Sequence, residues 1–302
     1  MHRTACFASL WLYHHHAGFY AERKAFSSGE ILFKCRGKTF VHRRCINFPV
    51  VKFKCCSIGN VEYIPLTPEP GSAQPELRVG ERILPLFPLS LVVQPSATVP
   101  LHIFEMRYRL LFNRIKDGDK LFGIVLYNKN NDSVARYGCM MELVRFEPLP
   151  DGRMLTVNVG KERFRVNHII SDKPYITALV APVEDERESC DDTVFSLGES
   201  VWTQLNQVLT LSNKLYGKSV QWSEDLRRLS PDSNSSRDWH RLVMFSHKVS
   251  QVLDIPVQDQ QLLLQTQSTR ARFQHQLEML EQARKFLAAQ LAINDALDKR
   301  SF

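Results

Sequence analysis

Long apolar runs are missing from this 302-residue sequence, although 44% of its residues are hydrophobic. A helix that crosses a membrane needs about 18 or more predominantly apolar residues in succession. No stretch of the chain meets that requirement, so we expect no membrane-spanning helix and no membrane partner. The hydrophobic residues instead favour one large packed domain or two small ones.

Cysteine is scarce beyond residue 60, where only Cys139 and Cys190 occur. Two isolated thiols do not make a disulfide framework, and they favour a reducing compartment. The cysteines nearer the N-terminus lack the C-x2-C spacing of a zinc knuckle. Cys35, His42 and Cys45 come nearest to a ligand set, but their spacing is unsuitable. We therefore predict neither a metal site nor a cofactor.

Net positive charge is absent from most of the chain. Residues 1–60 hold ten of the 39 Lys and Arg and two of the 32 Asp and Glu, a balance of +8, and the remaining 29 basic and 30 acidic residues leave −1. The part of the chain after residue 60 is nearly neutral, so its overall charge does not attract nucleic acid, and we predict no such partner. The basic, acid-poor leader (residues 1–60) is typical of an organelle transit peptide. The alternatives are an unstructured basic tail, or an upstream extension that was wrongly assigned to the coding sequence.

The next two parts of the chain differ in composition and in hydrophobic pattern. Residues 61–80 are rich in proline and glycine, which predicts a linker without regular structure. Residues 81–188 contain short apolar runs separated by turn residues, which predicts a small barrel or sandwich. The predicted strands are Ile83–Leu89, Leu121–Tyr127, Met140–Phe146, Met154–Val159, Phe164–Ile170 and Tyr175–Val180.

One helix interrupts these strands. Apolar residues recur at helical spacing from Phe104 through Tyr108 and Leu111 to Ile115, and Gly118 suits a C-terminal cap. Glu105 and Arg109 are four residues apart and are expected to pair on the exposed side of this helix.

Residues 189–302 are predicted to form a helical subdomain. An apolar stripe from Val194 to Leu211 predicts a first helix that Gly217 ends. A polar loop is expected over 223–238, a second helix over 239–253, and a third, long helix with Pro256 in its first turn.

A heptad seam runs along the third helix. It can pack on the other helices of its own domain, or it can form a homodimeric coiled coil through residues 256–297. The seam positions are Phe273, Leu277, Leu280, Arg284, Leu287 and Leu291.

Catalytic motifs are missing as well: there is no G-x-S-x-G, no H-E-x-x-H, and no H-x-E paired with C-x-x-C. The nearest approach to a phosphate-binding loop, Ser212–Ser219, has serine at the first glycine position and follows a helical stripe instead of a strand. The acidic run Glu184–Asp192 is interpreted as a solvated face. We predict that the chain is not an enzyme.

Scattered histidines support the same prediction. They fall in different predicted elements, so each is interpreted as a surface residue or a satisfied core residue and not as a catalyst. They are His102, His168, His240, His247 and His275.

Two blocks of sequence resemble the N-terminal, substrate-binding domain of Lon-type proteases. The first comprises LPLFPL at 84–89 and VPLHIFEMRY at 99–108, and the second comprises LPDGR at 149–153 and GKERFRV at 160–166. The likeness continues through LSNKLYGK at 211–218, QQLLL at 260–264 and TRARF at 269–273, which resemble stand-alone plant members of the family.

The resemblance implies an α+β fold, with a PUA-like β-barrel followed by a C-terminal helical bundle that has one long heptad helix. Stand-alone plant members are directed to plastids, so a plastid is expected here and a mitochondrion is the alternative. The turn after the first strand reads Pro-Gly in the family but Pro95-Ser96 here. If that turn needs a positive φ, serine costs roughly 1 kcal/mol more than glycine.

The resemblance also implies that the module recognises unfolded or tagged polypeptides, with a protease or chaperone as a further partner. The candidate peptide-binding residues are Phe87, Phe104, Arg107 and Tyr108. The aromatic members could instead only pack the core. Pro85 and Pro88 predict that the first strand lies at a sheet edge, where an extended peptide could add.

Two other functions compete with polypeptide recognition. One is a structural or assembly factor that acts through the heptad helix. The other is RNA binding, because PUA-like barrels elsewhere bind RNA, and the charge of −1 outside the leader counts against it.

The leader generates a first prediction. Because its +8 balance is typical of an import signal, protein recovered from plastids should lack residues 1–60 or most of them. Mass spectrometry of the N-terminal peptide measures this. Recovery of intact Met1 from the cytosol would contradict it.

Overall fold

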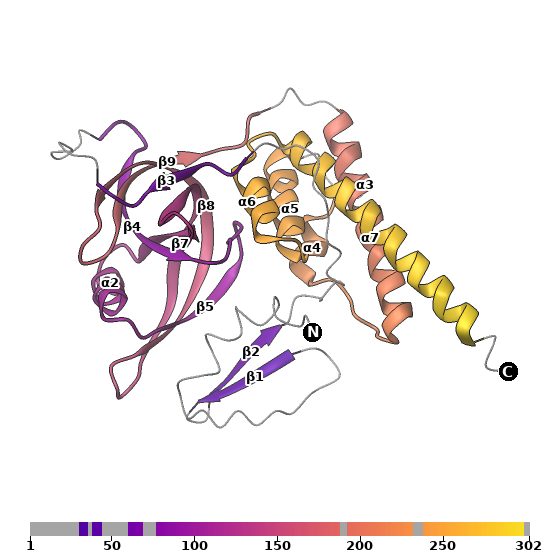
Figure 1. Cartoon of the computed structure of the whole chain (residues 1–302), viewed down its shortest axis with the longest axis horizontal. Coiled ribbons are helices and arrows are strands. Elements are labelled where there is room, and N and C mark those ends of the chain that lie inside the picture. The colour runs from indigo at the N-terminus through magenta and orange to yellow at the C-terminus, as the bar shows by residue number, and fades with distance from the viewer. Residues whose placement is uncertain are drawn as a thin grey trace.

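The computed structural model describes residues 30–35, 38–43, 60–68, 77–187, 192–231 and 238–298. A strand-rich part and a helical part lie side by side (Figure 1). The predicted α+β class is therefore confirmed. Among the described residues, no helix is long and apolar enough to cross a membrane.

The large sheet has seven strands in the order β3-β7-β6-β4-β9-β8-β5. β7 also pairs with β8, so five strands close into a ring, with β3 added to β7 and β5 added to β8. The strands are β3 Tyr63–Pro65, β4 Arg82–Leu89, β5 Thr98–Ile103, β6 Leu121–Asn128, β7 Ser133–Pro148, β8 Met154–Ser171 and β9 Thr177–Val183.

The prediction that the first strand lies at an edge is wrong. β4 is one of the five strands of the ring, between β9 and β6. Its first half pairs with β9 and its second half with β6. The Leu86 N–H donates to the Ile176 carbonyl at 2.8 Å, so every second N–H of β4 points to the β9 side. The nitrogen of Pro88 faces the β9 side, but Pro88 lies beyond the residues of β4 that pair with β9. The nitrogen of Pro85 faces the β6 side, but the pairing of β4 with β6 begins only at Leu86. Each proline thus faces a side where its strand has no partner.

Two predicted strands are one in the structure. β8 continues through Gly160, which was expected to separate them. The β4–β5 turn crosses β8 at this point, with the Ser96 N–H on the Gly160 carbonyl (3.0 Å) and the Gly160 N–H on the Ala97 carbonyl (2.8 Å). A Cβ on Gly160 would lie 2.7 Å from the Gln94 carbonyl oxygen. The glycine therefore allows a close crossing instead of ending the strand.

Regular structure also occurs where none was predicted. β1 (Glu30–Cys35) and β2 (Lys38–Arg43) form an antiparallel pair within the leader. β3 lies within the predicted linker and extends the sheet beside β7. The other leader residues up to 59, with the candidate ligand Cys45, lie outside the described ranges.

α2 (Met106–Lys116) packs on the ring through aromatic side chains. Phe112 lies between Phe87 of β4 and Phe122 of β6, with ring centroids 6.1 and 5.0 Å apart. Gly118 does not adopt the expected left-handed cap. Lys120 has the positive φ instead (62°), and its N–H donates to the Ile115 carbonyl at 3.1 Å.

The helical part has five helices among the described residues: α3 Asp192–Tyr216, α4 Glu224–Leu229, α5 Trp239–Val252, α6 Val257–Gln265 and α7 Thr269–Asp298. As predicted, Gly217 ends α3 in a left-handed conformation (φ 60°), and the Lys218 N–H closes the turn on the Asn213 carbonyl at 3.0 Å. Two predictions are wrong, because α4 lies in the expected loop and the long third helix is broken between α6 and α7.

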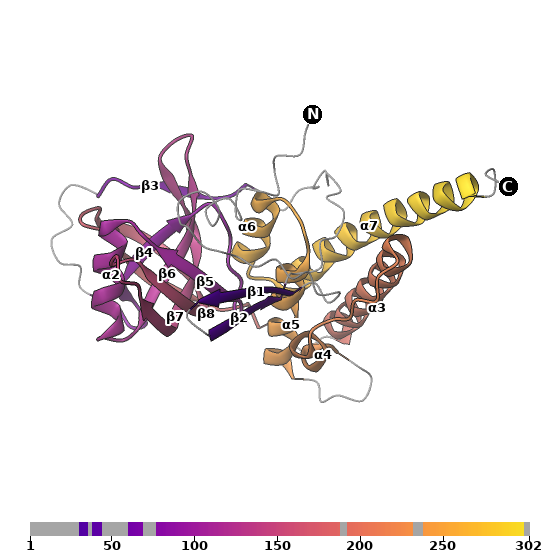
Figure 2. The ribbon, with the colours of Figure 1, turned by 90° about the horizontal axis from the view of Figure 1, so that it is seen from below.

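The heptad seam of α7 packs largely inside its own domain. α7 lies along α3 (Figures 1 and 2), and Phe273, Leu280 and Leu287 are buried in the cluster that both helices form. The first of the two alternatives for the seam, packing within the domain, therefore applies to these residues.

The Gln94–Ala97 turn does need a positive φ, since Ser96 has φ 64° and the Ala97 N–H donates to the Gln94 carbonyl at 3.2 Å. Glycine adopts this conformation without the clash of a Cβ atom. Ser96→Gly should therefore raise the free energy of unfolding by about 0.5–1 kcal/mol.

Urea denaturation followed by circular dichroism measures this change. Ser200→Gly is the matched control, since Ser200 is exposed within α3 and glycine should destabilise a helix there by about 0.5–1 kcal/mol. A loss of stability in both variants would contradict the strained turn.

Candidate functional site

Two of the four predicted binding residues are buried. Phe87 and Tyr108 are 7% and 5% exposed, and their rings meet edge to face with centroids 4.3 Å apart. Burial raises the pKa of Tyr108 to about 12, so its phenol stays neutral. These two residues fasten α2 to β4, which favours the core-packing alternative for them.

The other two predicted residues lie at the surface where α2 begins. Phe104 is 47% exposed. The Arg107 guanidinium pairs with Glu105 at 2.9 Å and lies 4.6 Å from the centroid of the Tyr108 ring. The predicted pair of Glu105 with Arg109 is not formed, because Arg107 occupies that carboxylate.

Two further apolar residues are exposed on the same helix, and sequence reasoning missed them. Met106 is 71% exposed and Leu110 is 39% exposed, against 0% for their neighbour Leu111. They are four residues apart, so they share a side of α2 that points away from the ring. Phe104, Met106 and Leu110 are called the α2 face below. The sequence did contain a signal for their exposure, because neither Met106 nor Leu110 belongs to the apolar stripe that includes Tyr108, Leu111 and Ile115.

The turn between β7 and β8 lies against this helix. Arg109 packs directly on Gly152, where a Cβ would be 2.0 Å from the guanidinium. β5 ends beside the same turn, since Ile103 pairs with Met154. Segments 99–108 and 149–153, far apart in sequence, thus form one end of the strand-rich part. Figure 1 places α2 on the side away from the helical part.

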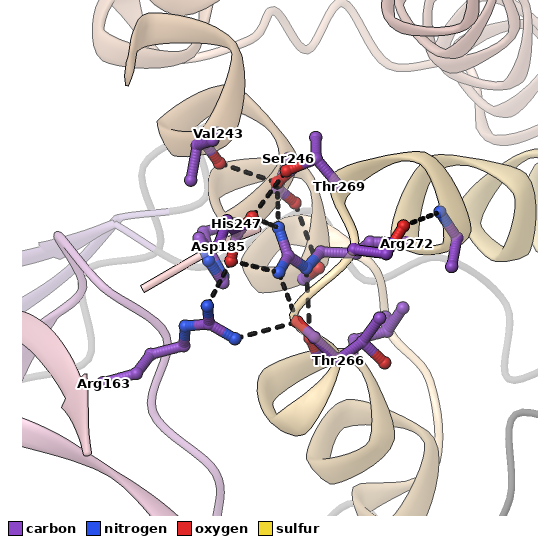
Figure 3. Close-up of polar contacts among 12 residues, drawn as sticks. Arg163, Asp185, Val243, Ser246, His247, Thr266, Thr269 and Arg272 are labelled. Carbon is purple, nitrogen blue, oxygen red and sulfur yellow. Dashed lines mark hydrogen bonds and ion pairs between the residues drawn. The ribbon is translucent and has the colours of Figure 1, made fainter. Parts of the chain in front are cut away.

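A second cluster of polar residues joins the two parts of the molecule (Figure 3). The side chain of Asp185, which follows β9, is 2% exposed and pairs with Arg163 of β8 and Arg272 of α7. Its Oδ2 is 2.8 Å from Arg272 Nη1 and also accepts from the Thr269 hydroxyl at 2.5 Å. One carboxylate therefore joins a strand of the ring to the last helix.

The cluster has two positively charged arginines and one carboxylate, and carbonyl groups at the end of α6 compensate the remaining positive charge. Arg163 donates to the carbonyls of Leu264 and Thr266, both at 2.8 Å, and Arg272 donates to Leu263 at 3.2 Å. The end of a helix carries partial negative charge on such groups. Burial and the nearby Arg272 lower the pKa of Arg163 to about 10, which still leaves it charged at neutral pH. These contacts also give a reason for the break after α6, because its last carbonyls bind the guanidinium groups.

His247 of α5 is a satisfied core histidine, as the sequence interpretation allowed. Its Nδ1 lies 3.0 Å from Gln94 Oε1 in the β4–β5 turn. Burial, and then the charges of Arg272 and Arg163, lower the pKa of His247 well below its usual value, so the ring is neutral at pH 7. Gln94 also donates to the Gln260 carbonyl at 3.3 Å. The turn is thereby held against α5 and α6.

Sequence reasoning missed Asp185, which lies in the run interpreted as a solvated face. Nothing in the local sequence separates Asp185 from Glu184, because the arginines that bind it are 22 and 87 residues away. Only their approach in space identifies it. Among the described residues, no group of three His, Cys, Asp or Glu side chains is placed to hold a metal ion.

The profile of the ATP-dependent protease La (LON) substrate-binding domain matches residues 83–282. That range covers the ring, α2 and most of the helical part. The chain therefore belongs to the Lon substrate-binding domain family, as the two sequence blocks indicated.

Curated relatives are much longer proteins. The chain is 30% identical over 147 residues to a Lon protease of Flavobacterium johnsoniae, covering 46% of this chain and 18% of that one. It is 23% identical over 223 residues to Lon protease 2 of Myxococcus xanthus, covering 72% and 25%. The chain thus spans about a fifth to a quarter of the length of these relatives.

Solved structures include two isolated domains. One is the Lon N-terminal domain protein from Xanthomonas campestris, with a TM-score of 0.46, 21% identity, and coverage of 65% of this chain and 98% of that one. The other is the N-terminal domain of the Mycobacterium avium complex Lon protease, with a TM-score of 0.48, 12% identity, and coverage of 66% and 98%.

The Asp185 cluster generates a prediction about stability. Asp185→Asn leaves two buried guanidinium groups without their carboxylate, and it should lower the free energy of unfolding by about 3–5 kcal/mol. Urea denaturation measures the loss. Asp151→Asn is the control, because Asp151 pairs with Arg153 at the surface and its loss should change little. Equal small effects in both variants would mean that the cluster does not hold the parts together.

Proposed function

We propose that this chain is a non-catalytic module that binds unfolded or tagged polypeptides through the α2 face. Its family supports a substrate-recognition role in proteolysis. The observation that carries the site is the exposure of three apolar side chains at one end of the strand-rich part, two of them within the segment that matches the family signature and the third, Leu110, just after it. Exposed apolar residues that gather in one place are typical of interaction sites.

The construction of α2 suits this role. Phe87 of β4 and Phe122 of β6 pack against its inner side, so the outer side is presented on a rigid element without an ordering cost. Burial of each exposed apolar side chain contributes roughly 1–3 kcal/mol. Ordering of the polypeptide offsets much of that gain, so binding should be weak, in the micromolar range.

The relatives suggest how bound polypeptides are used. They are Lon proteases, several times longer than the matched region. We propose that this chain recognises substrates and passes them to a separate protease or chaperone. The Ser212–Ser219 segment supports a role without ATP hydrolysis, since it is the end of α3 and not a loop that follows a strand. A plastid, with a mitochondrion as the alternative, remains our proposal for the compartment.

A second candidate function is assembly through α7. Phe286, Ile293 and Leu297 are 37%, 59% and 57% exposed on its C-terminal half, outside the buried seam. A homodimer through residues 256–297 would therefore use these residues, because the seam itself packs against α3.

One experiment tests which of the two surfaces binds polypeptides. The double variant Met106→Ser/Leu110→Ser removes most of the α2 face, and Ile293→Ser is a control of similar exposure on α7. We expect the double variant to bind a test protein, kept unfolded by reduction and alkylation with iodoacetamide, about ten-fold or more weakly. Fluorescence anisotropy measures the dissociation constant.

Melting temperatures accompany these measurements, because Phe87→Ala or Tyr108→Ala would lose about 3–5 kcal/mol of stability and cannot test binding. If the double variant binds with unchanged affinity and Ile293→Ser binds more weakly, the polypeptide-binding site lies on the helical part instead.

A further inference from the structure

α2 is strongly basic although the chain outside the leader is not. Its eleven residues, MRYRLLFNRIK, include Arg107, Arg109, Arg114 and Lys116 and no acid. The nearest acids, Glu105 and Asp117, only flank its two ends.

These charges lie on both sides of the exposed apolar residues. At about 100° per residue, Arg107 and Arg114 are seven apart and follow one side of the Met106–Leu110 line. Arg109 and Lys116, also seven apart, follow the other side. The exposed part of α2 therefore has an apolar centre between two basic rows.

Carboxylates neutralise little of this charge. Arg107 pairs with Glu105 at 2.9 Å. Arg114 donates to the Tyr175 hydroxyl at 3.0 Å, and Lys116 lies 5.2 Å from the centroid of the Phe146 ring. Arg109 packs on Met106 and Gly152. Within the described part of the chain, only the first of the four basic residues has a carboxylate partner.

We infer that the polypeptide bound at the α2 face carries acidic side chains next to its apolar ones. This inference rests on the proposed function and names the sequence class that the site prefers. Apolar burial supplies the affinity. The basic rows attract acidic flanks and disfavour basic flanks, because charge complementarity acts mainly on selectivity and association rate.

Three labelled peptides test the preference. They share alternating Leu and Phe positions and differ only in the residues between them, which are Glu, Gln or Lys. At low salt we expect the Glu peptide to bind about ten-fold more tightly than the Lys peptide, with the Gln peptide between them. At about 0.5 M NaCl the difference should shrink to two-fold or less, because exposed charges are screened.

Variants locate the effect. Arg107→Gln/Lys116→Gln removes one charge from each row and should reduce the Glu-to-Lys preference several-fold. Arg228→Gln/Lys285→Gln is the matched control, because both residues are exposed and form i,i+4 pairs on other helices. This control should leave the preference unchanged.

Failure of the inference and failure of the proposed function are distinguishable. Equal binding of all three peptides, lost in Met106→Ser/Leu110→Ser, would overturn the acidic preference and keep the proposed function. If no peptide binds, or if binding ignores that double variant, the proposed function itself fails. An equal loss of preference in the Arg228→Gln/Lys285→Gln control would assign the effect to overall charge and also overturn the inference.

Discussion

The arrangement of the two parts depends on one buried carboxylate. Asp185 binds Arg163 of the ring and Arg272 of the last helix, and the remaining donors of both arginines reach carbonyls near the end of α6. Burying two like charges side by side is unfavourable unless each is paired and hydrogen-bonded. Here the geometry satisfies both groups only when β8, α6 and α7 are together. The cluster therefore fixes one relative position for the parts.

The candidate site is separated from that constraint. α2 lies at the other end of the ring, and its orientation is set by aromatic contacts with β4 and β6. One side of the helix is thus required for folding, whereas the other is exposed and rich in apolar and basic residues. A helix fixed in this way can present side chains to a partner without reorganising the core.

Several elements were predictable because their signals are local. Strands β4 and β6, the helix around Tyr108, and the α3 stop at Gly217 follow from periodicity and turn chemistry. The departure from Pro-Gly at Pro95-Ser96 drew attention to that turn, and the structure shows that Ser96 has a positive φ. The failures concern contacts between distant residues. Gly160 reads locally as a separator, but it lies inside a strand because the β4–β5 turn crosses there. The break after α6 could not be predicted either, because one of the arginines that bind its last carbonyls, Arg163, is 101 residues away from Leu264.

The sequence by itself determined the family, the α+β class and the segment that carries the candidate site. These follow from ordered motifs and from periodicities of two and 3.6 residues, which are properties of neighbouring positions. Only the tertiary structure decided which signature residues are exposed, that β4 lies inside the ring, and that Asp185 is buried while nearby acids are not. The physical reason is that burial and pairing depend on which distant groups arrive at a residue, and one chain's local pattern does not contain that information.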